Sequence, residues 1–190
     1  MMNLVLFASG SGSNAENVVK YFKQHPSVKI SALFCNNAKA GVIAKMDALE
    51  VPVVVFNKAL FEDSAQFLSH VSSYKPDYII LLGFLWKIPV YLVKAYAGKI
   101  INLHPALLPK YGGSGMYGRH VHHAVKQSGD TETGITLHRV NEHYDEGEVI
   151  AQFKCLVEPT DTIEIIAEKI HLLEQEHVPA VIKSLSFPFI

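Results

Sequence analysis

Short apolar runs alternate with amphipathic segments through residues 3–103, and this alternation restricts the fold more than any other feature of the sequence. Strands are predicted over residues 3–8, 28–34, 53–56, 78–82 and 99–103. Helices are predicted from residue 14 onward and over 38–50, 62–74 and 89–97, with Pro89 in the first turn of the last one. Residues 78–82 are apolar on both faces, which is typical of a central parallel strand covered by helices. The pattern therefore predicts an α/β fold with a doubly wound, mostly parallel sheet.

The alternation ends after Asn102. Prolines and glycines crowd residues 105–118, which predicts a long ordered loop. Strands over 133–140 and 149–157 are predicted to form an antiparallel extension of the sheet. A final helix is predicted to begin with a capping box at Asp161 and to run to about Gln175, with a kink or restart at Pro179. The length suits a single domain, 1–190.

Composition excludes several classes of partner. The chain has 17 basic and 18 acidic residues and a net charge of −1, which argues against nucleic acid or an anionic membrane surface as a partner. No apolar stretch reaches the roughly 20 residues of a membrane span, and no secretory segment precedes the first apolar run, so we expect a cytoplasmic protein. Cys35 and Cys155 lie outside any zinc-binding spacing and are expected to be reduced thiols.

Polar residues and glycines follow four of the predicted strands at the point where each strand ends. They are residues 9–14, Asn36 with Asn37, residues 83–86, and Asn102 with His104. Ligands bind beyond the carboxyl ends of the strands in an open parallel sheet. The sequence therefore predicts one binding crevice at which these four strand ends converge.

The first of these strand ends, Gly10-Ser-Gly-Ser-Asn-Ala15, is a glycine-rich turn between a strand and a helix. Free N–H groups and the helix dipole favour an anion there, so Gly12, Ser13 and Asn14 are predicted to hold a phosphate. The turn also fits a dinucleotide fingerprint, but Asn36 stands where that motif needs an acidic residue. We favour a monophosphate site and keep a dinucleotide site and a purely structural turn as the alternatives.

Asn102 and His104 are two residues apart on a predicted strand, so their side chains share one face and point into the crevice. Pro105 keeps His104 in an extended conformation. Asp145 lies in an acidic loop between the last two predicted strands. Two readings of these residues stay open: a strand-ending pair with a solvated turn, or a carboxylate that raises the pKa of His104 beside a reacting centre.

Three histidines in Arg119-His-Val-His-His123 suggest a metal site at first sight. On a helix, however, they do not all share a face, and no cysteine or pair of carboxylates accompanies them. We therefore predict a surface helix here and no metal site.

These segments together resemble those of the folate-dependent formyltransferases, most closely the branch that acts on glycinamide ribonucleotide. The matching segments are residues 9–14, 76–77, 83–84, 101–111, 133–138 and 145–147, which span nearly the whole chain in the family's order. The string Asn-x-His-Pro-x-Leu-Leu-Pro with a downstream Asp-x-Gly is specific to this superfamily. The Gly-Ser-Asn turn selects the branch.

The resemblance implies transfer of the formyl group of 10-formyltetrahydrofolate to the amine of 5′-phosphoribosylglycinamide, in purine biosynthesis and without a metal. Asn102, His104 and Asp145 would be catalytic, with His104 largely protonated. The family also implies a cis peptide bond between Leu108 and Pro109.

The resemblance also implies which residues bind the substrates. Gly12, Ser13 and Asn14 would hold the 5′-phosphate, and Glu174 would contact the ribonucleotide. The folate would contact Asn102 and lie along the segment formed by Leu85, Trp86, Lys87 and Ile88. The glycine-rich residues 112–118 form a longer loop than the family pattern has, and we expect a flexible cover over the site.

Other functions remain as alternatives. A formyltetrahydrofolate deformylase is expected to carry a further N-terminal domain, a methionyl-tRNA formyltransferase a further basic C-terminal domain, and a sugar-nucleotide formyltransferase a longer chain. From a different class, a non-catalytic or dehydrogenase-type dinucleotide-binding domain would use the same glycine turn without the His-Asp pair.

Overall fold

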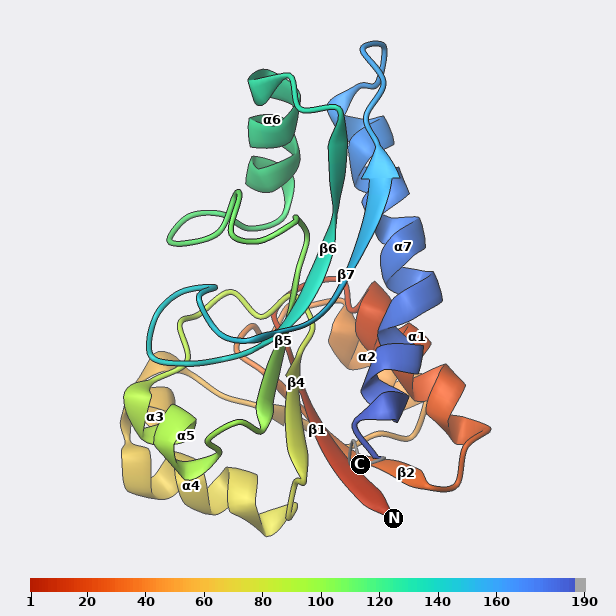
Figure 1. The fold of residues 1–190 in the computed structure, drawn as a ribbon. Helices are drawn as coiled ribbons and strands as arrows, with labels where there is room; N and C mark the ends of the chain where they lie inside the picture. The colour runs from red at the N-terminus through yellow and green to blue at the C-terminus, as the bar shows by residue number, and fades with distance from the viewer. Residues whose placement is uncertain (187–190) are drawn as a thin grey trace.

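The computed structural model describes residues 1–186, which form a seven-stranded sheet with helices on both faces (Figure 1). The strand order is β3-β2-β1-β4-β5-β6-β7. The first five strands are parallel, and β6 and β7 pair antiparallel at one end. The strands are β1 (Met2–Ala8), β2 (Val28–Cys35), β3 (Val53–Val55), β4 (Tyr78–Leu81), β5 (Ile100–His104), β6 (Glu132–Arg139) and β7 (Val149–Leu156). The predicted α/β class and its antiparallel extension are confirmed.

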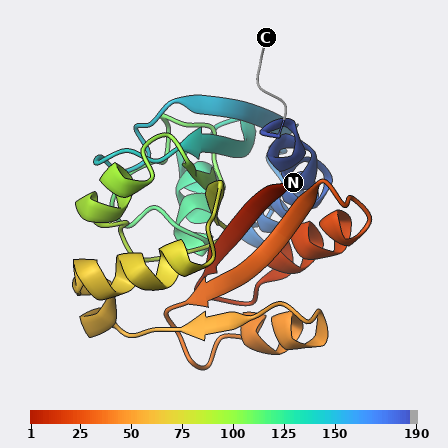
Figure 2. The same cartoon turned by 90° about the horizontal axis from the view of Figure 1, so that it is seen from below.

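Two groups of helices cover the two faces of the sheet. Figure 2, from below, shows one group of helices on each side of the strands. The first group is α1 (Ser13–Lys23), α2 (Val42–Ala48) and α7 (Ile163–Ser184). The second group is α3 (Lys58–Glu62), α4 (Ser64–Ser73) and α5 (Val90–Ala95). The remaining helix, α6 (Arg119–Ser128), packs against α7 beside β6.

The central strand β1 supplies side chains to two cores at once. Leu4 and Leu6 belong to the core beneath α1, α2 and α7, whereas Val5 and Phe7 belong to the aromatic core beneath α3, α4 and α5. Successive side chains of a strand point to opposite faces, so a strand with helices on both sides must be apolar at every position. This is why residues 4–8 of β1 form a continuous apolar run and are fully buried.

The helix predicted over residues 62–74 is present as α4, which begins at Ser64, but the prediction missed the separate helix α3 before it. Asn57 caps α3 by accepting a hydrogen bond from the backbone N–H of Leu60 at 2.9 Å. Asp63 caps α4 in the same way, accepting from Gln66 at 3.0 Å, and its extended backbone separates the two helices. Asparagine and aspartate are favoured at helix N-caps, so these two residues were the signal for the break. Pro89 likewise lies at the N-cap of α5 rather than within its first turn.

The helix α7 is continuous through Pro179, so the predicted end near Gln175 is wrong. A proline inside a helix removes the hydrogen bond to the carbonyl four residues earlier, which here is that of Gln175. The side chain of Asn17 on α1 donates to this carbonyl oxygen at 2.8 Å instead. The N-cap of α7 is Thr162, one residue later than predicted, while Asp161 forms an ion pair with Lys169 at 2.5 Å.

Within residues 1–186, no helix is both long enough and apolar enough to cross a membrane. The two cysteines are free thiols, with Cys35 buried and Cys155 half-buried. Burial raises the pKa of both thiols above the ordinary value, so neither has the low pKa of a reactive cysteine.

The contact between Asn17 and Gln175 predicts a coupled effect on stability. Replacing Asn17 with alanine leaves the carbonyl of Gln175 without its donor and should lower the free energy of unfolding by about 1 kcal/mol. In a Pro179→Ala background the restored backbone N–H can bond that carbonyl, so Asn17→Ala should cost less. Urea denaturation of the four proteins of this cycle measures the difference, and equal costs in the two backgrounds would contradict the prediction.

Candidate active site

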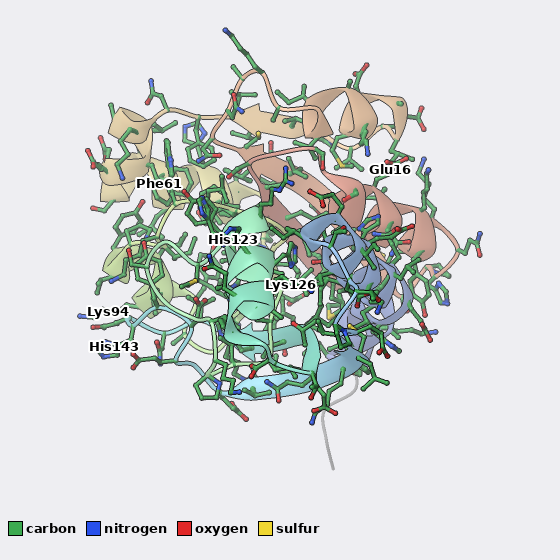
Figure 3. The ribbon with its side chains drawn as sticks, turned by 90° about the horizontal axis from the view of Figure 1, so that it is seen from above. Glu16, Phe61, Lys94, His123, Lys126 and His143 are labelled. Atoms are coloured by element: carbon green, nitrogen blue, oxygen red, sulfur yellow. The ribbon has the colours of Figure 1, made fainter. Side chains whose placement is uncertain are left out.

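A cavity of about 680 Å³ lies beyond the carboxyl ends of β4 and β5, where ligands bind in sheets of this kind. Its volume is within the range of small-molecule sites. Five segments contribute to its wall: residues 83–88, 102–105, 113–118, 140–145, and one side of α7. Figure 3, the view from above, shows α6 in the middle of the molecule, with Phe61 on one side of it and Glu16 on the other.

The strand β5 brings Asn102 and His104 to the cavity as predicted. Both side chains line it, and His104 is only 3% exposed. Leu103, between them, belongs to the core beneath α1 and α7. On the adjacent strand β6, His138 pairs directly with Asn102, and the Asn102 Nδ2 and His138 Nε2 atoms are 3.1 Å apart. The antiparallel pairing therefore places a second imidazole beside the predicted pair.

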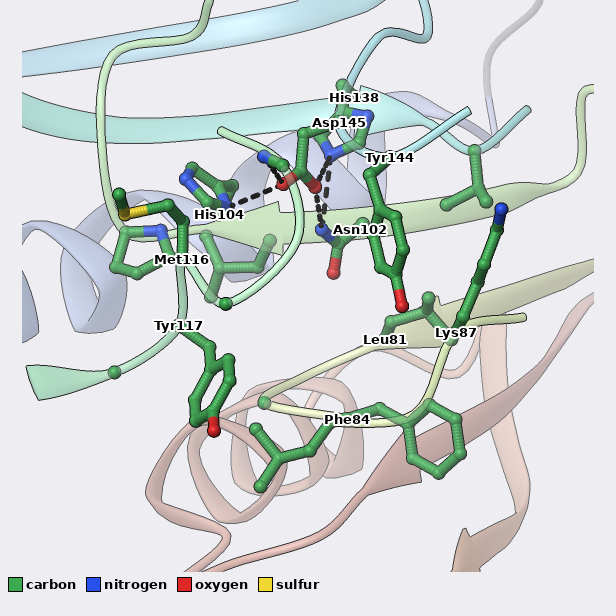
Figure 4. Close-up of a pocket in the computed structure, with 18 of the residues that line it drawn as sticks. Leu81, Phe84, Lys87, Asn102, His104, Met116, Tyr117, His138, Tyr144 and Asp145 are labelled. Carbon is green, nitrogen blue, oxygen red and sulfur yellow. Dashed lines mark hydrogen bonds and ion pairs between the residues drawn. The ribbon is translucent and has the colours of Figure 1, made fainter. Parts of the chain in front are cut away.

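Asp145 lies between two imidazoles (Figure 4). Its Oδ2 atom is 3.6 Å from Nδ1 of His104, and its Oδ1 atom is 3.6 Å from Nε2 of His138. The backbone N–H of Gly113 donates to Oδ2 at 2.8 Å, and Nδ2 of Asn102 donates to Oδ1 at 3.5 Å. The side chain is only 10% exposed. The structure therefore decides against a solvated acidic turn and places the carboxylate beside His104.

The backbone of Asp145 adopts the left-handed conformation, with φ at 54°. This conformation is uncommon for a residue with a side chain, although aspartate is among those that tolerate it. Gly147, two residues later in this loop, does not have a positive φ. Gly147 is needed for space, since a Cβ atom there would collide with the carbonyl of Arg139.

His104 is neutral near pH 7 in the absence of ligand. Burial lowers the pKa of its imidazole, and the opposing influence of the Asp145 charge and of a hydrogen bond to Tyr111 does not restore the ordinary value of 6.5. The expectation of a largely protonated His104 is therefore wrong for this state. Its Nε2 atom lies 2.8 Å from the carbonyl oxygen of Tyr111. A carbonyl only accepts, so Nε2 carries the hydrogen and Nδ1, which faces Asp145, is free.

Asp145 remains ionised despite its burial. Burial raises the pKa of this carboxyl, but the adjacent His138 side chain and the hydrogen bond from the Gly113 N–H, together with the charges that His104 and His138 can carry, lower it below its usual range. A proton that arrives at the free Nδ1 of His104 therefore meets a negative charge 3.6 Å away.

His138 is the residue of this cluster to which sequence reasoning gave no role. A signal was present, because Ile135 and Leu137 alternate with Thr136 and His138 in the strand β6. Such alternation places Thr136 and His138 on one face. What the sequence did not reveal was the register that sets His138 opposite Asn102.

The N-terminal turn has the geometry that an anion site requires. Gly12 has a left-handed φ of 73°, and a Cβ atom there would overlap Val42. α1 begins at Ser13 without a side-chain cap, so N–H groups of its first turn are open to a ligand. Asn14 lines the cavity, whereas Gly12 and Ser13 form the turn just before it.

Asn14 connects this turn to α7. Its Nδ2 atom donates to Glu174 at 2.9 Å, and its Oδ1 atom accepts from Gln175 at 2.8 Å. Glu174 also lines the cavity. Burial raises the pKa of its carboxyl above the ordinary value, although Asn14 and His171 act in the opposite direction. Two predicted ribonucleotide contacts, 160 residues apart in sequence, are thus in direct contact.

The segment from Leu85 to Ile88, for which the resemblance implies folate contact, lines one side of the cavity. Leu85 is 51% exposed and Ile88 is buried. The Nζ atom of Lys87 lies 5.0 Å from the centre of the Tyr144 ring, and these two side chains stand together at one side of the opening in Figure 4. Trp86 packs against Phe61 of the aromatic core.

The loop 112–118 and the start of α6 close the opposite side of the cavity, where Met116 and Tyr117 lie in Figure 4. The predicted surface helix holds for His120 and His123, which are exposed. It is wrong for His122, which is 7% exposed, lines the cavity and has a pKa lowered by burial.

Over the described part of the chain, no cluster of three His, Cys, Asp or Glu side chains has the arrangement of a metal site. The peptide bond between Leu108 and Pro109 is cis, as the resemblance implied.

The sequence model of the formyl transferase family matches residues 2–182. The chain belongs to the formyl transferase family. It is 35% identical over 190 residues to phosphoribosylglycinamide formyltransferase of Bacillus subtilis, covering 97% of this chain and 95% of the relative. It is 37% identical to the chloroplastic phosphoribosylglycinamide formyltransferase of Arabidopsis thaliana, with 92% of this chain covered, and it spans 61% of that relative's length.

A solved structure with the same fold is that of glycinamide ribonucleotide transformylase 1 from Geobacillus kaustophilus. The two chains are 34% identical, superpose with a TM-score of 0.89, and are covered to 97% and 98% respectively.

The protonation state of His104 gives a prediction that needs no substrate. NMR titration should find its pKa below 6.5. Replacing Asp145 with asparagine removes the charge that raises this pKa, so the value should fall further. Asp47→Asn, the same change at an exposed position on α2, should leave it unaltered. A rise in the His104 pKa in Asp145→Asn would contradict this account.

Proposed function

We propose that this protein transfers the formyl group of 10-formyltetrahydrofolate to the amine of 5′-phosphoribosylglycinamide, giving formylglycinamide ribonucleotide and tetrahydrofolate in purine biosynthesis. The observation that carries the proposal is one cavity that joins an anion-binding helix start to the cluster of Asn102, His104 and Asp145. The relatives with which the chain aligns over nearly its whole length are phosphoribosylglycinamide formyltransferases.

The ribonucleotide occupies the end of the cavity between α1 and α7. Gly12, Ser13 and Asn14 offer backbone N–H groups to the 5′-phosphate, where the positive end of the helix dipole also favours an anion. Glu174 accepts hydrogen bonds from sugar hydroxyl groups nearby. The contact of Asn14 with Glu174 supports this arrangement, because it keeps the phosphate-binding turn at a fixed distance from the residue that binds the sugar.

The folate occupies the other end, along Leu85, Trp86, Lys87 and Ile88. Exposed apolar surface at Leu85 and the half-exposed ring of Tyr144 suit a flat heterocycle. The Nζ atoms of Lys58 and Lys87 lie 5.1 Å and 5.0 Å from the rings of Trp86 and Tyr144, and they place positive charge where the donor's glutamate reaches solvent.

Asn102 and His104 carry the chemistry where the two ends meet. The amine nitrogen forms a bond to the formyl carbon, and the side-chain N–H of Asn102 donates to the carbonyl oxygen as negative charge develops there. The free Nδ1 of His104 accepts the proton that the amine loses, and Asp145 stabilises the resulting imidazolium. The bond from the formyl carbon to N10 of the folate then breaks, and the proton passes to N10.

The test is direct. The intact protein is mixed with 5′-phosphoribosylglycinamide and 10-formyltetrahydrofolate, and the folate absorbance and the formylated product are followed. Turnover that requires both substrates supports the proposal. Release of formate without the amine would identify a deformylase instead, and absence of turnover would rule the proposed function out.

Loss of the oxyanion donor should affect the chemical step. Asn102→Ala should lower kcat by about 100-fold or more, with a smaller change in the KM of the ribonucleotide. Lys99→Ala, at the exposed position just before β5, should leave kcat unchanged. An active Asn102→Ala variant would remove this residue from the mechanism while leaving the fold assignment intact.

A substitution in the phosphate-binding turn should affect KM rather than kcat. Ser13→Ala removes one side-chain donor that is remote from the reacting atoms, so the KM of the ribonucleotide should rise about 3- to 10-fold with kcat nearly unchanged. Ser11→Ala, an exposed serine of the same turn, is the control. A fall in kcat without a rise in KM would place the phosphate elsewhere.

A further inference from the structure

One short turn contacts both members of the His104–Asp145 pair. The carbonyl oxygen of Tyr111 accepts from Nε2 of His104 at 2.8 Å, and two residues later the N–H of Gly113 donates to Oδ2 of Asp145 at 2.8 Å. The position of residues 111–113 therefore sets the hydrogen-bonding state of the imidazole and the carboxylate together.

The backbone of this turn is held in an unfavourable conformation. Tyr111 has a left-handed φ of 57°, which is rare for a residue with an aromatic side chain and costs conformational free energy. Gly113 follows with a φ of 97°, and a Cβ atom at Gly112 would lie 2.7 Å from Cδ2 of Leu108. Other contacts must hold Tyr111 in place for the turn to persist.

Those contacts lie at the end of α6, outside the cavity. The hydroxyl of Tyr111 donates to Oδ2 of Asp130 at 2.8 Å and lies 2.5 Å from Oγ of Ser128. The Nζ atom of Lys110 is 2.9 Å from the same carboxylate. Hydrogen bonds from Lys110 and Tyr111 lower the pKa of Asp130, so the group that anchors the tyrosine is charged at neutral pH.

We propose that Tyr111 and Asp130 are positioning residues that fix the tautomer of His104 for formyl transfer; this rests on the proposed function. With the anchor in place, the Tyr111 carbonyl keeps the hydrogen on Nε2 and leaves Nδ1 free to accept the amine's proton. Without it, Tyr111 leaves its left-handed conformation and its carbonyl moves away from Nε2. The hydrogen then shifts to Nδ1, where it bonds Asp145 and blocks the acceptor.

The kinetic test uses Tyr111→Phe and Asp130→Ala. Each should lower kcat about 10-fold while the KM values of both substrates change less than about twofold, because neither residue lines the cavity. The double variant should lose no more than either single one, since both changes break one contact. Asp130→Asn keeps an acceptor for the hydroxyl and should restore most of kcat.

The spectroscopic test separates positioning from a general loss of structure. Nitrogen-15 shifts of the His104 ring should show hydrogen on Nε2 in the unchanged protein and a mixture of tautomers in Tyr111→Phe and Asp130→Ala. The control is Glu132→Ala, which removes a nearby carboxylate that pairs with Lys154 at 3.2 Å on β6 and β7 and does not contact Tyr111. It should change neither the tautomer nor kcat.

Retention of the Nε2 tautomer in both variants would overturn the proposal, whatever their stability. If Tyr111→Phe does not fold, Asp130→Ala still decides the question, because its side chain lies at the surface end of the anchor. If the unchanged protein transfers no formyl group, the proposed function fails, while the tautomer measurement still tests the anchor by itself.

Discussion

The geometry of the cavity depends on keeping one carboxylate ionised at a position that water hardly reaches. Asp145 is 10% exposed, and burial by itself raises the pKa of its carboxyl. The adjacent His138 side chain on β6 and the N–H of Gly113 reverse that effect. These partners come from distant parts of the chain, so the antiparallel pairing, the loop 112–118 and the Asp145 loop must form together for the charge to be stable.

Burial also decides the charge of His104. Removing its ring from water disfavours the charged form more strongly than the neighbouring carboxylate favours it, so the ring is neutral and able to accept a proton. The carbonyl of Tyr111 then selects which nitrogen is free. Once Nδ1 of His104 has accepted a proton, the Asp145 carboxylate stabilises the charged imidazolium. A general base needs this stabilisation while the amine attacks.

Much of this arrangement could be predicted from local sequence. The apolar runs indicated the strands, and the polar residues at their ends indicated the cavity to which Asn14, residues 85–88 and Asn102 belong. The predictions were wrong where a contact from a distant segment determines the local structure. α7 continues through Pro179 because Asn17 of a different helix bonds the carbonyl that proline leaves open, and no pattern within 161–184 contains that information.

By itself, the sequence determined the fold class, the edge of the sheet at which a ligand binds, and the placement of Asn102 and His104 on one face, because each follows from a local periodicity. Only the tertiary structure decided that Asp145 is buried, that His138 is its second partner and that His104 is neutral. Charge state depends on desolvation and on neighbours from distant segments, and these exist only once the strands have paired and the loops have closed over them.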